Sequence, residues 1–135
     1  MNKTIPTSGQ LERTLSQRIQ AFYRDLLGHQ PSKVTCQLFD QKLAIIIEDS
    51  ITTAEELLVT KGNEQLAEQV RSSLDDAIKP QLKTLIKEIL EVDVVDLLSD
   101  ATLKTGRTGI IVVLTDSPQV SNRKAIPKAT NKSSS

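Results

Sequence analysis

Apolar and polar residues alternate along this chain in patterns that predict seven elements of secondary structure. The first is a helix from residue 10 to about residue 27. Its apolar residues recur at steps of three and four: Leu11, Leu15, Ile19, Phe22 and Leu26. That period is typical of an amphipathic helix with one buried side. Gly28 and Pro31 follow and are expected to end the helix.

Two strands are predicted next, joined by a short polar turn at residues 40–42. Val34, Cys36 and Leu38 alternate with polar residues, which indicates a strand buried on one face. Residues 43–47 are apolar at every position, so this second strand should be covered on both faces and lie centrally in its sheet.

Residues 52–90 predict two helices. Thr52 and Glu55 have the spacing of a capping box, which begins a short helix that residues 62–63 interrupt. A long helical stripe follows: Leu66, Val70, Leu74, Ala77, Ile78, Leu82, Leu85, Ile86, Ile89 and Leu90. Pro80 lies inside this stripe, and we expect a kink or a break into two helices near residues 77–80.

The last two elements are a strand over residues 92–98 and a strand over residues 110–114, with a loop at 99–109 between them. The order is therefore α-β-β-α-α-β-β. Two β-hairpins linked by helices predict the α+β class, with a four-stranded antiparallel sheet and helices packed mainly on one face.

One domain accounts for most of the chain. Its 135 residues can build one ordinary core. We place the domain at residues 10–115 and expect the polar, unpatterned residues 1–9 and 116–135 to be disordered tails.

The second and fourth strands are apolar on both faces, so something must cover the side of the sheet that lies away from the helices. The first helix, a second copy of the chain or another protein could do so. We expect a homodimer, because a symmetric dimer is the commonest way to bury such a surface.

Charge and composition narrow the possible partners. The chain has 17 basic and 17 acidic residues, which leaves no overall field to attract nucleic acid. Cys36 is the only cysteine, and the first residues do not resemble a signal peptide, so we expect a reducing, cytoplasmic location. No apolar run approaches the length of a membrane-spanning helix, and we expect no membrane insertion.

Residue types that could carry catalysis are few. His29 is expected to be a surface histidine in a turn and Cys36 a core residue, because neither has a recognisable catalytic partner. One histidine and one cysteine do not make a familiar zinc site, so no metal or other cofactor is expected. The acidic pairs at 48–49, 55–56 and 75–76 are expected to be solvated or to serve helix ends. We assign no catalytic residues and predict that the chain is not an enzyme.

The predicted loop at residues 99–109 is the best candidate for small-molecule binding. It combines hydroxyl groups and glycines with two cations, Lys104 and Arg107, which could face an anion such as phosphate or bicarbonate. It does not match the phosphate-loop pattern, because a strand follows it rather than a helix. A flexible connection between two strands is the alternative interpretation.

Five segments of the chain, in this order and spacing, carry a family resemblance: Phe22-Tyr23 through Gly28, Pro31-Ser32-Lys33-Val34, Ile51-Thr52-Thr53-Ala54-Glu55, Lys79-Pro80-Gln81-Leu82, and Val94-Val95-Asp96-Leu97-Leu98-Ser99-Asp100. Together they resemble the MpsC-like soluble domain family of bacteria, over about residues 10–115. The chain departs from the family at Thr53, where relatives often carry proline at the start of the helix, a favourable but optional choice.

The resemblance implies association with a cation-translocating, membrane-potential-generating system, related to uptake of dissolved inorganic carbon alongside membrane transport subunits. The family has no established catalytic residues to carry over. We therefore expect an accessory or regulatory protein of such a system. The alternative is a free-standing cytoplasmic dimer that binds an anion or another ligand in signalling, without enzymatic activity. An enzyme ranks last.

Overall fold

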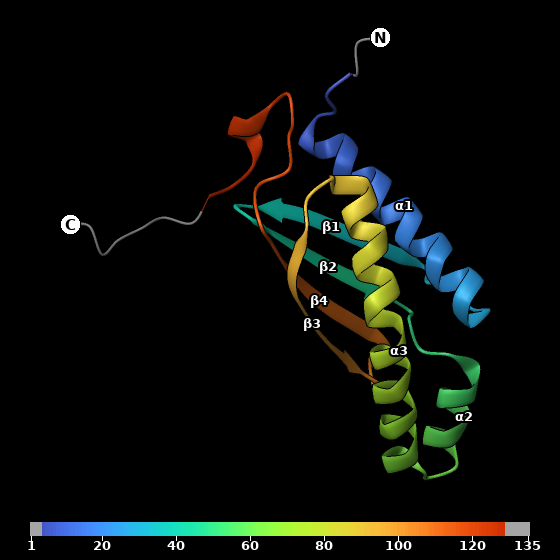
Figure 1. Ribbon diagram of the computed structural model, residues 1–135. Coiled ribbons are helices and arrows are strands. Elements are labelled where there is room, and N and C mark those ends of the chain that lie inside the picture. Colours follow the sequence, from blue (N-terminus) through green and yellow to red (C-terminus); the bar gives the residue numbers. More distant parts are fainter. Residues whose placement is uncertain (1–3, 129–135) are drawn as a thin grey trace.

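The computed structural model describes residues 4–128, which form three α-helices packed on a four-stranded sheet (Figure 1). The helices span Ser8–Leu27 (α1), Thr53–Thr60 (α2) and Glu64–Leu90 (α3). The strands span Lys33–Phe39 (β1), Lys42–Glu48 (β2), Val94–Thr102 (β3) and Arg107–Leu114 (β4). A short 3-10 helix, η1, covers Arg123–Ala125. The predicted element order and the α+β class are confirmed.

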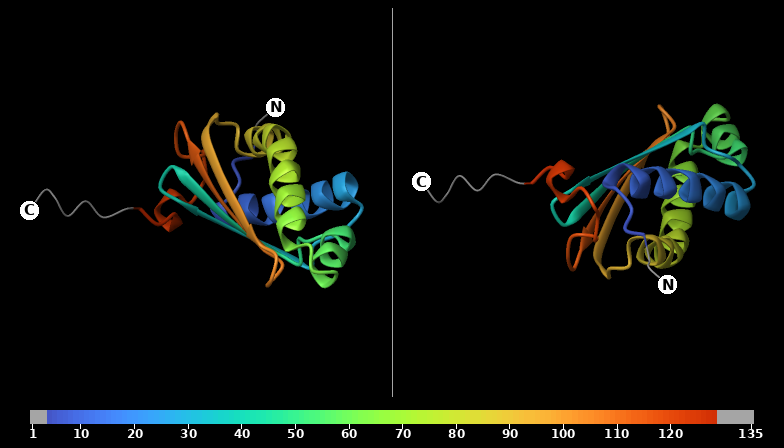
Figure 2. Two further views of the ribbon diagram at one scale, coloured as in Figure 1. Left: turned by 90° about the horizontal axis from the view of Figure 1, so that it is seen from below. Right: turned by 90° about the horizontal axis from the view of Figure 1, so that it is seen from above.

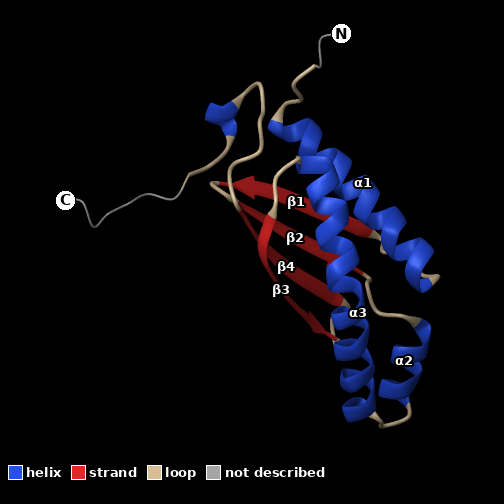
Figure 3. Cartoon of the chain, in the orientation of Figure 1, coloured by secondary structure: helices blue, strands red, loops and turns tan. Residues whose placement is uncertain are grey.

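The sheet is antiparallel throughout, with strand order β1-β2-β4-β3 (Figure 3). Two hairpins, β1–β2 and β3–β4, lie side by side, and β2 and β4 form the central pair. Ile45 of β2 lies opposite Ile110 of β4, and both are buried. The apolar run of the second strand therefore does mark a central strand, as predicted.

All three helices lie on one side of the sheet, as the two views of Figure 2 show. Strand residues that point toward α1 and α3 are buried, and their neighbours along each strand are exposed or half-buried. The other side, which we call the open face, is formed by alternate residues of the four strands. No described helix covers it. Of the three possible covers named above, the first helix is therefore ruled out.

Helix α1 begins at Ser8, two residues earlier than predicted. Thr7 and Gln10 form a capping box: the Thr7 hydroxyl accepts from the Gln10 amide at 3.1 Å, and the Gln10 side chain accepts from the Thr7 amide at 2.9 Å. Gly28 ends the helix in the left-handed conformation, with φ of 69°. Its place as the stop signal is confirmed.

Helix α3 runs without interruption through Pro80, so the predicted break into two helices is wrong. Proline offers no N–H to the carbonyl of Asp76, one turn earlier. Pro80 is exposed, so that carbonyl lies on a side of the helix where water can reach it, and burial on the opposite side holds the helix together.

Replacing Pro80 by alanine is expected to stabilise the protein by about 1–3 kcal/mol, because alanine restores the helix hydrogen bond and removes the steric clash. Urea denaturation would measure the change. Gln81→Ala is the matched control at the next exposed position and should change stability by less than about 0.5 kcal/mol. A loss of stability in Pro80→Ala would show that the helix relies on a bend at this residue.

In the first half of α3, the residues that face the core are not those of the predicted apolar stripe. Leu66 is exposed, whereas Ala67 and Arg71 are buried. Helix α2 packs against this part of α3, so its position decides which side is covered. The predicted stripe holds in the second half, where Leu82 and Ile86 are buried.

The predicted loop at residues 99–109 is mostly strand. Ser99 to Thr102 continue β3, Arg107 to Gly109 begin β4, and they pair with one another in register. Only residues 103–106 form a turn, with Gly106 at φ of 75°. The polar residues that favour a loop belong to the ends of β3 and β4, where the hairpin extends beyond the apolar core.

The segment after β4 packs onto the domain, which corrects its assignment as a disordered tail over residues 116–128. Val120 and Ile126 are buried in the core. The amide of Ser121 donates to the Pro6 carbonyl at 3.0 Å, and the Asp40 amide donates to the Pro127 carbonyl at 2.6 Å. Residues 1–3 and 129–135 of the predicted tails lie outside the described residues.

Candidate functional site

A buried ion pair joins α2 to α3. Glu55, in the first turn of α2, is fully buried, and Arg71 of α3 is 4% exposed. Arg71 donates from Nε to Glu55 Oε2 at 2.8 Å and from Nη2 to Glu55 Oε1 at 2.6 Å. This two-pronged geometry is the strong form of an arginine–carboxylate contact. The expectation that the acids at 55–56 are both solvated is therefore wrong for Glu55.

The same arginine ties down the connection between β2 and α2. Its Nη2 atom also donates to the Ser50 carbonyl at 2.9 Å, and its Nη1 atom donates to Asp75 Oδ1 at 3.4 Å. The Ser50 hydroxyl is hydrogen-bonded to the Thr108 hydroxyl of β4 at 2.7 Å. Arg71 thus links two helices, a loop and, through Ser50, the sheet.

The capping box predicted at Thr52 is present and shares its carboxylate with this network. The Glu55 amide donates to the Thr52 hydroxyl, and Glu55 Oε1 accepts from the Thr52 amide at 3.2 Å and hydroxyl at 2.8 Å. One carboxylate therefore starts α2 and anchors it to α3.

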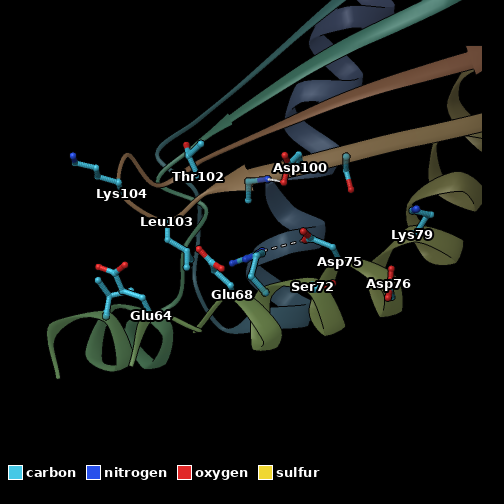
Figure 4. Close-up of a pocket in the computed structure, with 14 residues that line it drawn as sticks. Glu64, Glu68, Ser72, Asp75, Asp76, Lys79, Asp100, Thr102, Leu103 and Lys104 are labelled. Atoms are coloured by element: carbon cyan, nitrogen blue, oxygen red, sulfur yellow. Dashed lines mark hydrogen bonds and ion pairs between the residues drawn. The ribbon is translucent and has the colours of Figure 1, made fainter. Parts of the chain in front are cut away.

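An open cavity of about 750 Å³ lies above this network, between the exposed side of α3 and the β3–β4 hairpin (Figure 4). Its charged lining residues come from both sides: Glu64, Glu68, Arg71, Asp75, Asp76, Lys79, Asp100 and Lys104. Five acids and three bases give the lining a formal charge of −2. This balance disfavours a multiply charged anion.

Asp75 is the acid closest to the buried network. Burial raises the pKa of this carboxyl above its ordinary value of 3.8, and the Arg71 guanidinium opposes that rise by its charge and hydrogen bond. The negative charges of Glu55 and Asp100 add to the rise. Arg71 is thus shared by two acids, one fully buried and one at the floor of the cavity.

The structure separates the two cations that the sequence singled out. Lys104 is in the β3–β4 turn at the rim of the cavity, and Figure 4 shows its amino group turned away from α3. Arg107 is the first residue of β4 and donates from Nε to Glu48 Oε1 at 2.7 Å on the open face. Arg107 does not line the cavity. Anion binding by this pair stays a prediction.

His29 and Cys36 occupy separate places. The Nε2 atom of His29 lies 2.8 Å from the Asp49 carbonyl oxygen, between the end of α1 and the end of β2. Cys36 is 7% exposed on the helix-covered face, and burial raises the pKa of its thiol to about 11. The thiol is therefore protonated at neutral pH and is a poor nucleophile. Its predicted place in the core is confirmed.

Within residues 4–128, no three His, Cys, Asp or Glu side chains form a group that could hold a metal ion. Over the same residues, no helix is both long enough and apolar enough to cross a membrane.

These observations define the class of protein: an α+β domain with one helix-covered and one open sheet face, stiffened by a buried ion pair beneath a charged cavity. The chain belongs to the family described as Na⁺-translocating membrane potential-generating system (MpsC), whose model matches residues 7–116. The resemblance found from the five segments is confirmed. No curated protein and no solved structure matches the chain.

Proposed function

We propose that this chain is an accessory component that regulates or assembles a membrane-potential-generating transport system, with a role in ion or dissolved-inorganic-carbon transport. The observation that carries the proposal is the family match over residues 7–116, whose description names a Na⁺-translocating system. In this proposal the chain acts by binding protein subunits in the membrane and catalyses no reaction.

Two features support the non-enzymatic part of the proposal. The Cys36 thiol is buried and protonated, and the ring of His29 contacts the Asp49 backbone. The Arg71 guanidinium, which lines the cavity, is already engaged by Glu55 and Asp75. Because the buried charges of Arg71, Glu55 and Asp75 are paired with one another, they stiffen the domain rather than act on a substrate. Such a domain suits a protein that binds a partner through its surface.

Affinity capture tests this role. The tagged full chain would be expressed in its native host at limiting and at ample inorganic carbon, and membranes would be gently solubilised before capture. We expect integral membrane subunits of a cation or inorganic-carbon transporter to be recovered, as identified by mass spectrometry. Recovery of the chain's own second copy alone, under both growth conditions, would overturn the accessory role.

Two matched variants make the capture more specific. Leu57→Glu places a charge on the exposed side of α2, where Leu57 is 58% exposed, and Ile111→Glu places one on the open face. Both positions are exposed, so neither change should unfold the chain. Loss of the membrane subunits from one bait and not from the other would locate the contact on that surface.

A further inference from the structure

Three large apolar side chains are exposed to solvent at the centre of the open face. Ile46 is 43% exposed, Leu98 57% and Ile111 39%, and they belong to β2, β3 and β4 respectively. The strand register places Leu98 opposite Ile111, and Ile46 opposite Gly109. The three side chains therefore form one patch across neighbouring strands. A contiguous apolar patch of this kind marks an interaction surface.

Some amides at the two edges of the sheet are already hydrogen-bonded to side chains. On β1, the Leu38 amide donates to Glu12 Oε2 of α1 at 2.7 Å. On β3, the Leu97 amide donates to Asp96 at 2.9 Å and the Ala101 amide donates to Asp100 at 2.9 Å. Strand addition needs free edge amides. These contacts therefore oppose strand addition at Leu38, Leu97 and Ala101.

We propose that two copies of this chain pack face to face through the open faces of their sheets, with Ile46, Leu98 and Ile111 at the centre of the contact. Such packing is the arrangement of a β-sandwich, in which two sheets lie about 10 Å apart with strands nearly aligned. Each copy keeps its helices outside, so the dimer has layers in the order helix, sheet, sheet, helix.

The charges around the patch favour a second copy over a different protein. By strand register, Lys33 and Lys42 lie in the half of the open face formed by β1 and β2, and Asp96 and Asp100 lie in the half formed by β4 and β3. Glu48 and Arg107 also lie on this face, one in each half, and they pair with each other within one copy. A two-fold axis along the strands sets the basic side of each copy over the acidic side of the other. The face is therefore complementary to itself, as a symmetric interface requires.

The area of the open face determines the affinity expected for the dimer. Four strands of about seven residues present a flat area of about 400 Å² on each copy, or about 800 Å² for two copies, which is the size of a weak, transient interface. We therefore expect a dimer that dissociates at roughly micromolar concentrations. The chain's formal charge of zero adds no net repulsion between copies.

Analytical ultracentrifugation of the full chain over roughly micromolar to submillimolar concentrations tests this proposal. The wild type should approach the dimer mass with rising concentration. Ile46→Glu and Leu98→Glu, tested separately in case one does not fold, should remain monomeric with native circular dichroism. Leu57→Glu is the matched control on α2 and should dimerise like the wild type.

A monomeric wild type throughout that range would overturn the proposal and would assign the open face to another protein. Unchanged dimerisation in well-folded Ile46→Glu and Leu98→Glu would also overturn it, because the contact would then lie elsewhere. The double variant Lys33→Glu/Lys42→Glu should weaken dimerisation at least several-fold, and the exposed control Lys61→Glu should not. This measurement uses purified protein, so its outcome is independent of the capture experiment.

Discussion

Replacing Arg71 by methionine is expected to lower the free energy of unfolding by about 3–5 kcal/mol, the usual cost of removing one partner of a buried ion pair. The fully buried Glu55 carboxylate would lose the cation beside it and both hydrogen bonds from Arg71. The Ser50 carbonyl would lose its donor as well. Urea denaturation followed by circular dichroism measures the loss, which is a large share of the stability of a domain this size.

The expected loss has a local signature. Glu55 is the only buried residue of α2, so this short helix depends on Arg71 to remain against α3. Hydrogen exchange in Arg71→Met should therefore show faster exchange at the amides of α2, with β2 and β4 still protected. Uniform loss of protection in all elements would contradict this view of Arg71 as the anchor of α2.

A second variant separates buried charge from lost packing. Glu55→Gln removes the charge, and glutamine can still serve in the capping box with Thr52. The double variant Glu55→Gln/Arg71→Met should therefore recover much of the stability that Arg71→Met loses, because no uncompensated charge is left in the interior. Arg18→Met is the matched control: Arg18 pairs with Glu88 at 3.6 Å on the surface, and its loss should cost less than about 1 kcal/mol.

The buried pair of Glu55 and Arg71 could not be predicted from local sequence patterns. Glu55 and Arg71 are 16 residues apart on two helices, and no local spacing connects them. One feature of the sequence does indicate that Arg71 is buried. Arg71 follows Ala67 by four residues and precedes Ile78 by seven, so it falls on a helical stripe whose other members are apolar. A charged residue at such a position indicates a buried partner.

The elements that were predicted correctly carry strong local signals. The capping box at Thr52, the stop at Gly28 and the apolar run of β2 each follow from neighbouring residues. The capping box at Thr7 has the same four-residue form and could have placed the start of α1. Local hydrogen-bonding rules thus suffice for helix ends when the polar partners are close in sequence.

The errors arose where long-range contacts override local preference. Ser99, Asp100 and Thr102 are polar, which favours a loop at residues 99–102, but these backbones pair with β4 in the structure. Val120 and Ile126 lie six residues apart in a segment with no regular apolar period, yet both are buried against the domain. Burial of two isolated side chains depends on where the chain returns in space, which no local pattern records.

Alkaline pH is expected to destabilise this protein, through two buried groups that stay protonated when folded. Burial raises the pKa of the Cys36 thiol from 9.0 to about 11 and, with the charge of Asp75 adding to it, the pKa of the Tyr23 phenol from 10.0 to about 12. Above pH 9 the unfolded chain loses these protons first, so the unfolded state is favoured as the pH rises.

The size of the effect follows from the two shifts. An elevation of two units corresponds to about 2.7 kcal/mol, so the pair together should remove about 5 kcal/mol of stability by pH 12. The thiol accounts for the window from pH 9 to 11 and the phenol for the window from pH 10 to 12. Below pH 9 both contributions to stability are fully present.

The composition of the chain makes this prediction unusually easy to test. It contains one tyrosine and one cysteine and no tryptophan, so the ultraviolet absorbance of phenolate reports Tyr23 alone. Denaturation midpoints of the wild type should fall steeply between pH 9 and 12. Tyr23→Phe keeps the buried ring and should flatten the fall between pH 10 and 12, and Cys36→Ala should flatten it between pH 9 and 11.

Two results would contradict this account. If the Tyr23 phenol of the folded protein ionised near pH 10, its ring would be hydrated and could not be the fully packed side chain that the structure places in the core. If Tyr23→Phe kept the wild-type pH profile, another group would cause the alkaline loss. A late, cooperative appearance of phenolate that coincides with unfolding is the expected result, because the buried phenol ionises only when the helices leave the sheet.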